Sequence, residues 1–329
     1  MKRITLIICL LCSLTLAAIP FADFPQTRIT NGIIEAELYL PDAKQGYYRG
    51  TRFDWSGVVS SLIYKGHTYF GQWFDKYSPT LHDAITGPVE AFVPIGYDEA
   101  KTGSEFMIIG VGGLRKPDEA KYHFANPYEI TNPGKWSVKK GKDQVTFVHE
   151  LTDAAGYSYV YQKVVKLTKD KPEMVLEHTL KNTGKRAIET NTYNHNFFVI
   201  DQQPTGPEIV TTFPFEIQAD GLGRNGLAEV QDKQVVYLKE LKKGENVFSS
   251  GLQGFSSSPK DYDIKIENRK SGAGVRITGD QPLSKMVFWA SATTSCPEPY
   301  IQVRAEPGQE FKWTLTYQFY TLPAAASGN

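Results

Sequence analysis

The chain has 329 residues, of which 41% are hydrophobic and 22% are charged, a composition typical of a globular protein and unlike that of a disordered chain. Its 36 Lys and Arg residues balance its 36 Asp and Glu residues, so the formal net charge is zero. A balanced charge gives no general field that attracts a polyanion, and we therefore expect neither a nucleic acid nor an anionic membrane as a partner.

The first 22 residues have the pattern of a targeting segment. Lys2 and Arg3 precede an apolar stretch, residues 4–16, and small residues follow at positions 17 and 18, as in a secretory signal peptide. The apolar stretch is shorter than the ~20 residues that span a bilayer, which favours a signal over the alternative, an N-terminal membrane anchor. We predict that residues 1–22 are a signal peptide cleaved near Ala18 or Ala22, and that the mature protein is secreted or periplasmic.

Cysteine usage limits how the exported protein is held together. Cys9 and Cys12 lie in the predicted signal, so only Cys296 remains. The protein must then fold without an intramolecular disulfide, although its compartment would allow one. With no helix N-terminus nearby to lower its pKa, Cys296 is expected to be a packed thiol, not a nucleophile.

A periodicity of two dominates the sequence after the signal. In several segments, polar residues alternate with apolar or aromatic residues, as in strands with one buried face. These segments are GIIEAELYLP, QVTFVHEL, YSYVYQKVVKLT, MVLEHTLKN and KWTLTYQFYTL. Polar turn clusters such as KNTGK and EPGQE separate them, and convincing helical patterns are almost absent. We predict an all-β fold in which residues 23–329 form one domain.

Two further expectations follow from the same alternation. Residues 144–199 are predicted to form a continuous antiparallel meander. His149 and His178 alternate with polar positions in this region, and we expect both on solvated faces.

Residues 46–75, GYYRGTRFDWSGVVSSLIYKGHTYFGQWFD, are the most aromatic part of the chain. Aromatic faces stack on the C–H faces of pyranoses, and Arg and Asp bond sugar hydroxyls. Alternation puts Arg52 and Asp54 on one face, where a buried charge needs a partner. These residues and Trp55 are candidates for sugar binding; the alternatives are an aromatic core and an ion pair between Arg52 and Asp54.

The segment TYNHNFFVID, residues 192–201, places a histidine in a strand that otherwise reads as core. Alternation puts His195 on one face with Tyr193 and Phe197, and Asn194 on the other. A histidine among aromatic residues is desolvated, and its proton can be poised near neutral pH. His195 is therefore a candidate catalytic residue; the alternative is a core histidine bonded to the backbone.

A second ionisable residue with an unusual setting is Glu298, which lies between Pro297 and Pro299. Proline fixes φ and lacks a backbone donor, so we expect a stiff loop here and not a regular central strand. Such a loop suits a positioned base. The alternative is a solvated turn carboxylate.

Three segments in this order resemble the aldose 1-epimerases, or galactose mutarotases. NTYNHNFFVID resembles their Asn-His-x-Tyr/Phe-Phe element. ENRKSGAGVRITGDQPLSKMVFWA, residues 267–290, resembles their Ser-Gly strand pair, and CPEPYIQVRAEPGQEFKWTLTYQFY, residues 296–320, resembles their Cys-x-Glu-Pro segment and closing strand. The resemblance covers residues 192–320, and it covers the earlier GTRFDWSGVVSSLIYKGHTYFG loosely.

The resemblance implies a large antiparallel β-sandwich of the galactose mutarotase-like supersandwich type. It also implies that His195 is the general acid and Glu298 the general base. Opening a cyclic hemiacetal requires one group to take the proton of the anomeric hydroxyl while another protonates the ring oxygen, and these two side chains have those chemistries. The expected partner is a carbohydrate, a monosaccharide or the end of a glycan, bound by Arg52, Asp54, Trp55, Arg115 and Asn194.

No cofactor or metal is expected, because no cluster of His, Cys and Asp has metal-ligand spacing. The sequence departs from the family pattern at one point. The family has a second histidine upstream, in a turn that also carries an arginine, whereas this chain reads IIGVGGLRKPDEAKYHF over residues 108–124. Glycines stand where the histidine is expected, and Arg115 or His123 would have to replace it. A non-catalytic carbohydrate-binding protein of the same fold is therefore a second hypothesis.

A third hypothesis is a glycoside-cleaving hydrolase or lyase, since one fold hosts several activities. A hydrolase needs a second carboxylate across the cleft from Glu298, and Glu90 and Asp54 are the nominees, although a surface or loop position is expected for Glu90. A sugar-phosphate epimerase ranks last because the chain is predicted to be exported. Its phosphate-binding residues would be Arg49, Arg52, Arg115 and Lys116.

Overall fold

The computed structural model describes residues 24–323, except residues 220, 223 and 224. The predicted signal, residues 1–22, lies outside the described residues. Nearly all regular structure in the described part is β, as predicted, and the helical elements there are two short 3₁₀ turns, η1 (Ile200–Gln202) and η2 (Pro259–Asp261). No helix of the described residues has the length and apolar character needed to cross a membrane.

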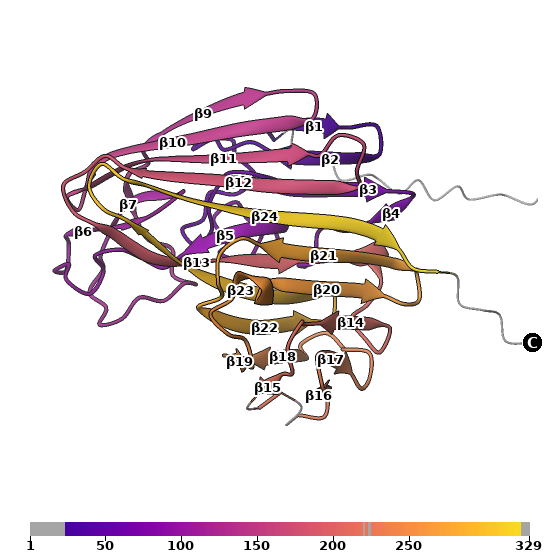
Figure 1. The fold of residues 1–329 in the computed structure, drawn as a ribbon. Coiled ribbons are helices and arrows are strands. Elements are labelled where there is room, and N and C mark those ends of the chain that lie inside the picture. The colour runs from indigo at the N-terminus through magenta and orange to yellow at the C-terminus, as the bar shows by residue number, and fades with distance from the viewer. Residues whose placement is uncertain (1–23, 220, 223–224, 324–329) are drawn as a thin grey trace, which may run out of the picture.

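The largest sheet has ten strands, and every neighbouring pair is antiparallel. Figure 1 shows its long strands side by side across the front of the molecule. In sheet order the strands are β16 (Ala228–Gln231), β17 (Gln234–Tyr237), β14 (Ile209–Thr212), β20 (Asp263–Asn268), β21 (Ala273–Gly279), β24 (Glu310–Thr321), β12 (Glu173–Asn182), β11 (Tyr157–Leu167), β10 (Gln144–Ala154) and β9 (Lys135–Lys140). Their alternating burial, clearest in β10 and β12, gives the sheet one face toward the core.

A second, five-stranded antiparallel sheet packs behind the first (Figure 1). In order its strands are β18 (Asn246–Ser249), β22 (Lys285–Ser291), β23 (Thr294–Ala305), β13 (Ile188–Phe197) and β5 (Gly87–Phe92). All six residues of β5 and the last six of β13 are buried, because this sheet is covered on both faces. Aromatic side chains join the two layers; Phe92 of β5, for example, packs edge-on against Tyr161 of β11 and Trp313 of β24.

Three small antiparallel sheets complete the described part. They consist of β1 (Gln26–Thr30), β2 (Ile34–Tyr39), β3 (Val58–Tyr64) and β4 (His67–Thr68); β6 (Glu105–Ile108), β7 (Gly112–Arg115) and β8 (Ile130–Asn132); and β15 (Gln218–Ala219) with β19 (Leu252–Gln253). The architecture is a large antiparallel β-sandwich, which confirms the predicted fold class.

The predicted meander from residue 144 to residue 199 is only partly correct. Strands β10, β11 and β12 are neighbours in the large sheet, but β13 leaves it and pairs with β23 and β5. The physical reason lies in the two strands. β12 alternates buried and more exposed positions, whereas the end of β13 is buried on both faces and needs cover from two sides.

Candidate active site

The site lies where strands β13 and β23 separate. The two strands pair in register from Ile188 with Ala305 to Tyr193 with Tyr300, and beyond that point only an isolated bridge, Phe198 with Ser295, joins them. Pro297 and Pro299 lie in this interval of β23 and cannot donate to the ladder. The amide of Asn196 fills part of the gap by donating to the Pro297 carbonyl, at 2.9 Å.

Glu298 therefore lies in a central strand, which corrects the expectation of a stiff loop. The prolines are tolerated because β23 keeps its register with β22 on the other side, where Val287 faces Glu298. They interrupt the pairing with β13 only next to His195. The two prolines do disturb the structure, but they break the hydrogen bonding between β23 and β13 and not the strand β23 itself.

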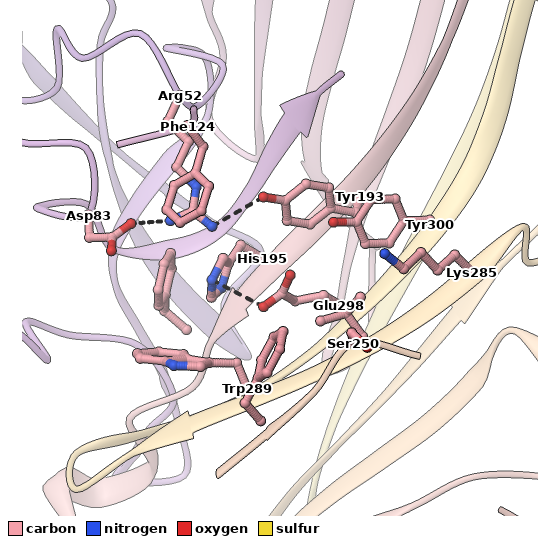
Figure 2. A pocket seen from close by; sticks show the side chains of 13 residues that line it. Arg52, Asp83, Phe124, Tyr193, His195, Ser250, Lys285, Trp289, Glu298 and Tyr300 are labelled. Atoms are coloured by element: carbon pink, nitrogen blue, oxygen red, sulfur yellow. Dashed lines mark hydrogen bonds and ion pairs between the residues drawn. The ribbon is translucent and has the colours of Figure 1, made fainter. Parts of the chain in front are cut away.

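A cavity of about 280 Å³ opens at this break. Figure 2 shows His195 and Glu298 at its centre, with Arg52 and Asp83 on one side and Lys285 and Tyr300 on the other. The volume is close to the lower end of the ~300–1,000 Å³ of typical ligand pockets and suits one sugar ring. The side chains that line it are those of Arg52, Asp83, Phe124, Tyr193, His195, Phe197, Phe248, Ser250, Lys285, Val287, Trp289, Glu298 and Tyr300.

His195 and Glu298 contact each other directly. The His195 Nε2 lies 3.3 Å from the Glu298 Oε1, and the two residues are 3% and 5% exposed. Burial lowers the pKa of His195 well below its usual value, and the nearby Arg52 lowers it further. This corrects the expectation that the proton of His195 is poised near neutral pH. Burial also raises the pKa of Glu298 to about 7, against the opposing effect of Arg52. Near neutral pH the pair therefore carries a transferable proton and little charge.

Aromatic rings hold the imidazole in place. His195 stacks on Phe197 with ring centroids 3.8 Å apart, and the edges of Phe53 and Trp289 contact it at 5.7 Å. The His195 Nδ1 is buried and has no hydrogen-bond partner among the described residues. The ring is thus positioned by packing and by Glu298 alone.

Arg52 forms the charged wall of the cavity. Its guanidinium pairs with Asp83 and donates to the Tyr193 hydroxyl at 3.2 Å. His82 contacts the other oxygen of Asp83 at 3.0 Å. Although burial raises the pKa of Asp83, the contacts with His82 and Arg52 outweigh it and leave that pKa below its usual value. Asp83 is therefore a carboxylate, and it keeps Arg52 oriented.

Asp54 and Trp55, two of the residues predicted to bind substrate, do not line this cavity. Trp55 is core, and its indole donates to the Gly50 carbonyl at 2.8 Å. Asp54 faces the interior, where Ser56 and Tyr161 donate to it. Alternation predicted that Asp54 and Arg52 share one strand face. That prediction is wrong because residues 51–57 do not form a strand.

Asn194 also points away from the cavity, into a buried polar cluster between the two sheets. Its amide donates to Glu90, which also contacts His178 and Lys163. Lys163 and His178 lower the pKa of Glu90 to about 2 in spite of its burial. Glu90 and Asp54 therefore cannot serve as the second carboxylate of a hydrolase in this cavity, and Glu90 is not a surface residue.

The expectation that His149 and His178 lie on solvated faces is wrong. Both are buried, and each ring stacks on a tryptophan, His149 on Trp136 and His178 on Trp313. A strand face that reads as polar is here the inner face of the large sheet.

Apart from its last residue, Phe124, the segment that departs from the family pattern lies outside the cavity. Arg115 is exposed and pairs with Glu129 at 2.8 Å, and His123 does not line the cavity either, although its neighbour Phe124 does. Gly110, at φ +77°, lies against Asp54, and a Cβ there would come within 2.5 Å of its carboxylate. That glycine serves close packing in the interior, and neither Arg115 nor His123 replaces the upstream histidine.

Sequence reasoning missed several residues of the cavity, and for some of them a signal existed. Tyr300 is two residues from Glu298, and Lys285 is two residues from Val287, so alternation along β23 and β22 places them on the site's face. Asp83 and Phe124 come from loops. No periodicity places loop residues at a site.

Comparison with known proteins supports the fold. No protein-family model matches the sequence, and no curated protein matches it. Solved structures do match. A protein of Synechocystis sp. PCC 6803 has a TM-score of 0.58 and 14% sequence identity, and the match covers 92% of this chain and 99% of that one. A galactose mutarotase-related enzyme from Lactobacillus acidophilus has a TM-score of 0.55 and 11% identity, with 91% and 98% of the two chains covered, and a galactose mutarotase-like protein from Lactobacillus casei has a TM-score of 0.53 and 14% identity, with 90% and 100% covered. The chain therefore has the galactose mutarotase-like β-sandwich fold.

Proposed function

We propose that the protein is an exported aldose 1-epimerase-like enzyme that interconverts the anomers of a free sugar. The observation that carries the proposal is the contact between His195 and Glu298 at the centre of a cavity of sugar size. The solved structures of the same fold that are described as a galactose mutarotase-related enzyme and a galactose mutarotase-like protein support it.

The geometry of the reaction fits two groups in contact. The anomeric hydroxyl and the ring oxygen of a pyranose are bonded to the same carbon, so the two atoms that exchange protons are neighbours. A base and an acid that serve them must also be neighbours. The 3.3 Å between Nε2 and Oε1 meets this condition, with the sugar placed over the pair and not between its members.

The proton balance closes on these two side chains. In ring opening the neutral imidazole of His195 takes the proton of the anomeric hydroxyl, the bond between C1 and the ring oxygen breaks, and the protonated carboxyl group of Glu298 protonates the ring oxygen. These roles are the reverse of those that the resemblance implies, because burial lowers the pKa of His195 and raises that of Glu298. The aldehyde then turns about the C1–C2 bond. Ring closure on the opposite face uses the same two groups with their roles exchanged, so the pair returns to its starting state.

The cavity walls supply binding. Trp289, Phe124 and Tyr300 offer ring faces or edges to the C–H surface of a sugar, and Arg52 and Tyr193 offer polar groups to its hydroxyls. The expected outcome is weak to moderate binding of one sugar ring with its anomeric carbon at the His195–Glu298 pair.

The test is proton NMR of freshly dissolved α-glucose and α-galactose with added protein. Wild type should raise the rate at which the β anomer appears, and Glu298→Gln and His195→Asn should each lower the added rate by about 10²-fold or more. Glu150→Gln, at an exposed position of β10, is the matched control and should act like wild type. A Glu298→Gln variant as fast as wild type would remove Glu298 from the mechanism.

A second candidate function is carbohydrate binding without catalysis. The observation that favours it is that the described residues lining the cavity include one histidine, His195, and no second one. Calorimetric titration with sugars separates the two functions, because binding without faster anomer exchange would select this one.

A further inference from the structure

We propose that the cavity prefers sugars that carry an anionic group next to the ring oxygen, namely uronic acids, and that Lys285 determines this preference. The inference rests on the proposed function and adds a substrate class to it. It starts from the charges around the cavity.

The cavity has one cation too many for a neutral ligand. Its lining includes the cations Arg52 and Lys285 and the carboxyl groups Asp83 and Glu298. Arg52 and Asp83 compensate each other, and Glu298 pairs with His195. Lys285 is exposed at the rim, and the ion pairs of the described residues include no carboxylate for it, although its charge acts on Glu298 and lowers the pKa of that group. When Glu298 is protonated, the lining therefore holds one more cation than it holds anions.

Hydrogen-bonding capacity points the same way. One oxygen of Asp83 accepts from Arg52 and the other faces His82. One oxygen of Glu298 is occupied by His195. Free donors are present on Lys285 and Ser250, which both line the cavity. The Lys285 ammonium can only donate, and a carboxylate only accepts, so this end of the lining fits a ligand that brings a carboxylate.

The position of Lys285 identifies which part of the sugar would carry that carboxylate. Lys285, Val287 and Trp289 alternate along β22 and line the cavity together, and Val287 lies opposite Glu298. Lys285 is therefore about 7 Å along the strand from the level of Glu298. Figure 2 shows its side chain extending beside Tyr300 toward Glu298, and its ammonium lies 5.4 Å from the Tyr300 ring centroid.

The chemistry of a uronic acid matches this spacing. Its carboxylate is attached to the ring carbon next to the ring oxygen, on the side away from the anomeric carbon. With the anomeric carbon and ring oxygen at the His195–Glu298 pair, the carboxylate is the nearest substituent that a long side chain at the rim can reach. A neutral hexose has only a hydroxymethyl group there.

The experiment compares anomer exchange of glucuronate and galacturonate with that of glucose and galactose, by NMR. Wild type should have a kcat/KM about tenfold higher for the uronates, and the preference should fall as salt is added. In Lys285→Met the ratio of uronate to neutral sugar should fall about tenfold, and Lys285→Arg should keep most of it. Lys265→Met, at an exposed position of β20 outside the cavity, is the matched control and should keep the wild-type ratio.

The outcomes separate this inference from the proposed function. Equal acceleration of neutral and acidic sugars, or a ratio that Lys285→Met does not change, overturns the inference while the proposed function stands. If no sugar is accelerated, the proposed function fails, and calorimetry decides the inference: glucuronate must bind more tightly than glucose, and Lys285→Met must abolish the difference. A preference for glucose 6-phosphate over glucuronate would overturn the assignment to a carboxylate.

Discussion

Replacing Glu298 with glutamine should stabilise the protein at alkaline pH, and the structure sets the size of the effect. Glu298 is almost fully buried, and its pKa is raised by burial from 4.5 to about 7. Because this pKa is higher in the folded than in the unfolded state, the folded state binds more protons between these values. The free energy of unfolding therefore falls as pH rises from 4.5 through 7.

Raising this pKa from 4.5 to about 7 corresponds to about 3 kcal/mol lost by wild type above pH 7. Glutamine at position 298 cannot ionise, so the variant escapes this loss while keeping a group that bonds His195 Nε2. Urea unfolding at about pH 5 and about pH 8.5 measures the effect. Other titrating groups are common to both proteins and cancel in the comparison.

The stability of Glu298→Gln relative to wild type should thus rise by up to about 3 kcal/mol between the two pH values. A difference that stays constant with pH would refute the reasoning. A variant that is less stable than wild type by the same margin at both values would show that His195 holds the carboxylate ionised as an ion pair.

Three further predictions concern the site and the buried polar cluster. The kcat/KM for anomer exchange should fall as pH rises above about 7, because Glu298, the proposed acid of ring opening, loses its proton at its raised pKa. A pH–rate profile that rises through this range would contradict that role and would favour Glu298 as the base. Arg52→Lys should lower kcat/KM about tenfold, because lysine cannot bridge Asp83 and Tyr193 as the guanidinium does. Unchanged kinetics would show that this bridge is not needed for activity. Lys163→Met should lower the free energy of unfolding by about 3–5 kcal/mol, because it leaves Glu90 buried without its cation. Urea unfolding measures this loss, with Lys181→Met at an exposed position as the control. An equal loss of stability in both variants would contradict the prediction.

The fold was predictable because its strands follow a simple rule. Alternation of polar and apolar residues identified β10, β11, β12 and β24, and the near absence of helical patterns fixed the class. The same rule failed where a strand is buried on both faces. β13 was predicted to continue the meander, but it belongs to the five-stranded sheet.

The site was predictable only in its centre. His195 and Glu298 stood out because each is an ionisable residue in an unusual local setting, and the structure brings them into contact. Their catalytic roles stay a prediction. The remaining walls depend on tertiary structure: Asp83, and not Asp54, pairs with Arg52. Asn194 faces the other side of its strand, as alternation predicted, and its assignment to substrate binding conflicted with that alternation.

Buried polar clusters are the hardest feature to see in a sequence. Glu90, Lys163 and His178 come from three strands of two sheets, and each alone reads as a surface residue. Only their mutual pairing makes burial tolerable. No local sequence pattern predicts such a pairing of residues that are far apart in the chain.

Exchange spectroscopy of a sugar at anomeric equilibrium tests the central claim most directly, because it needs no net reaction. With wild-type protein, glucuronate or glucose should give cross-peaks between the two anomers at a rate well above that of buffer. With His195→Asn the cross-peaks should return to the buffer rate. Identical exchange in the presence of wild type, variant and buffer, across neutral and acidic sugars, would contradict the assignment of this cavity as a site of anomeric proton transfer.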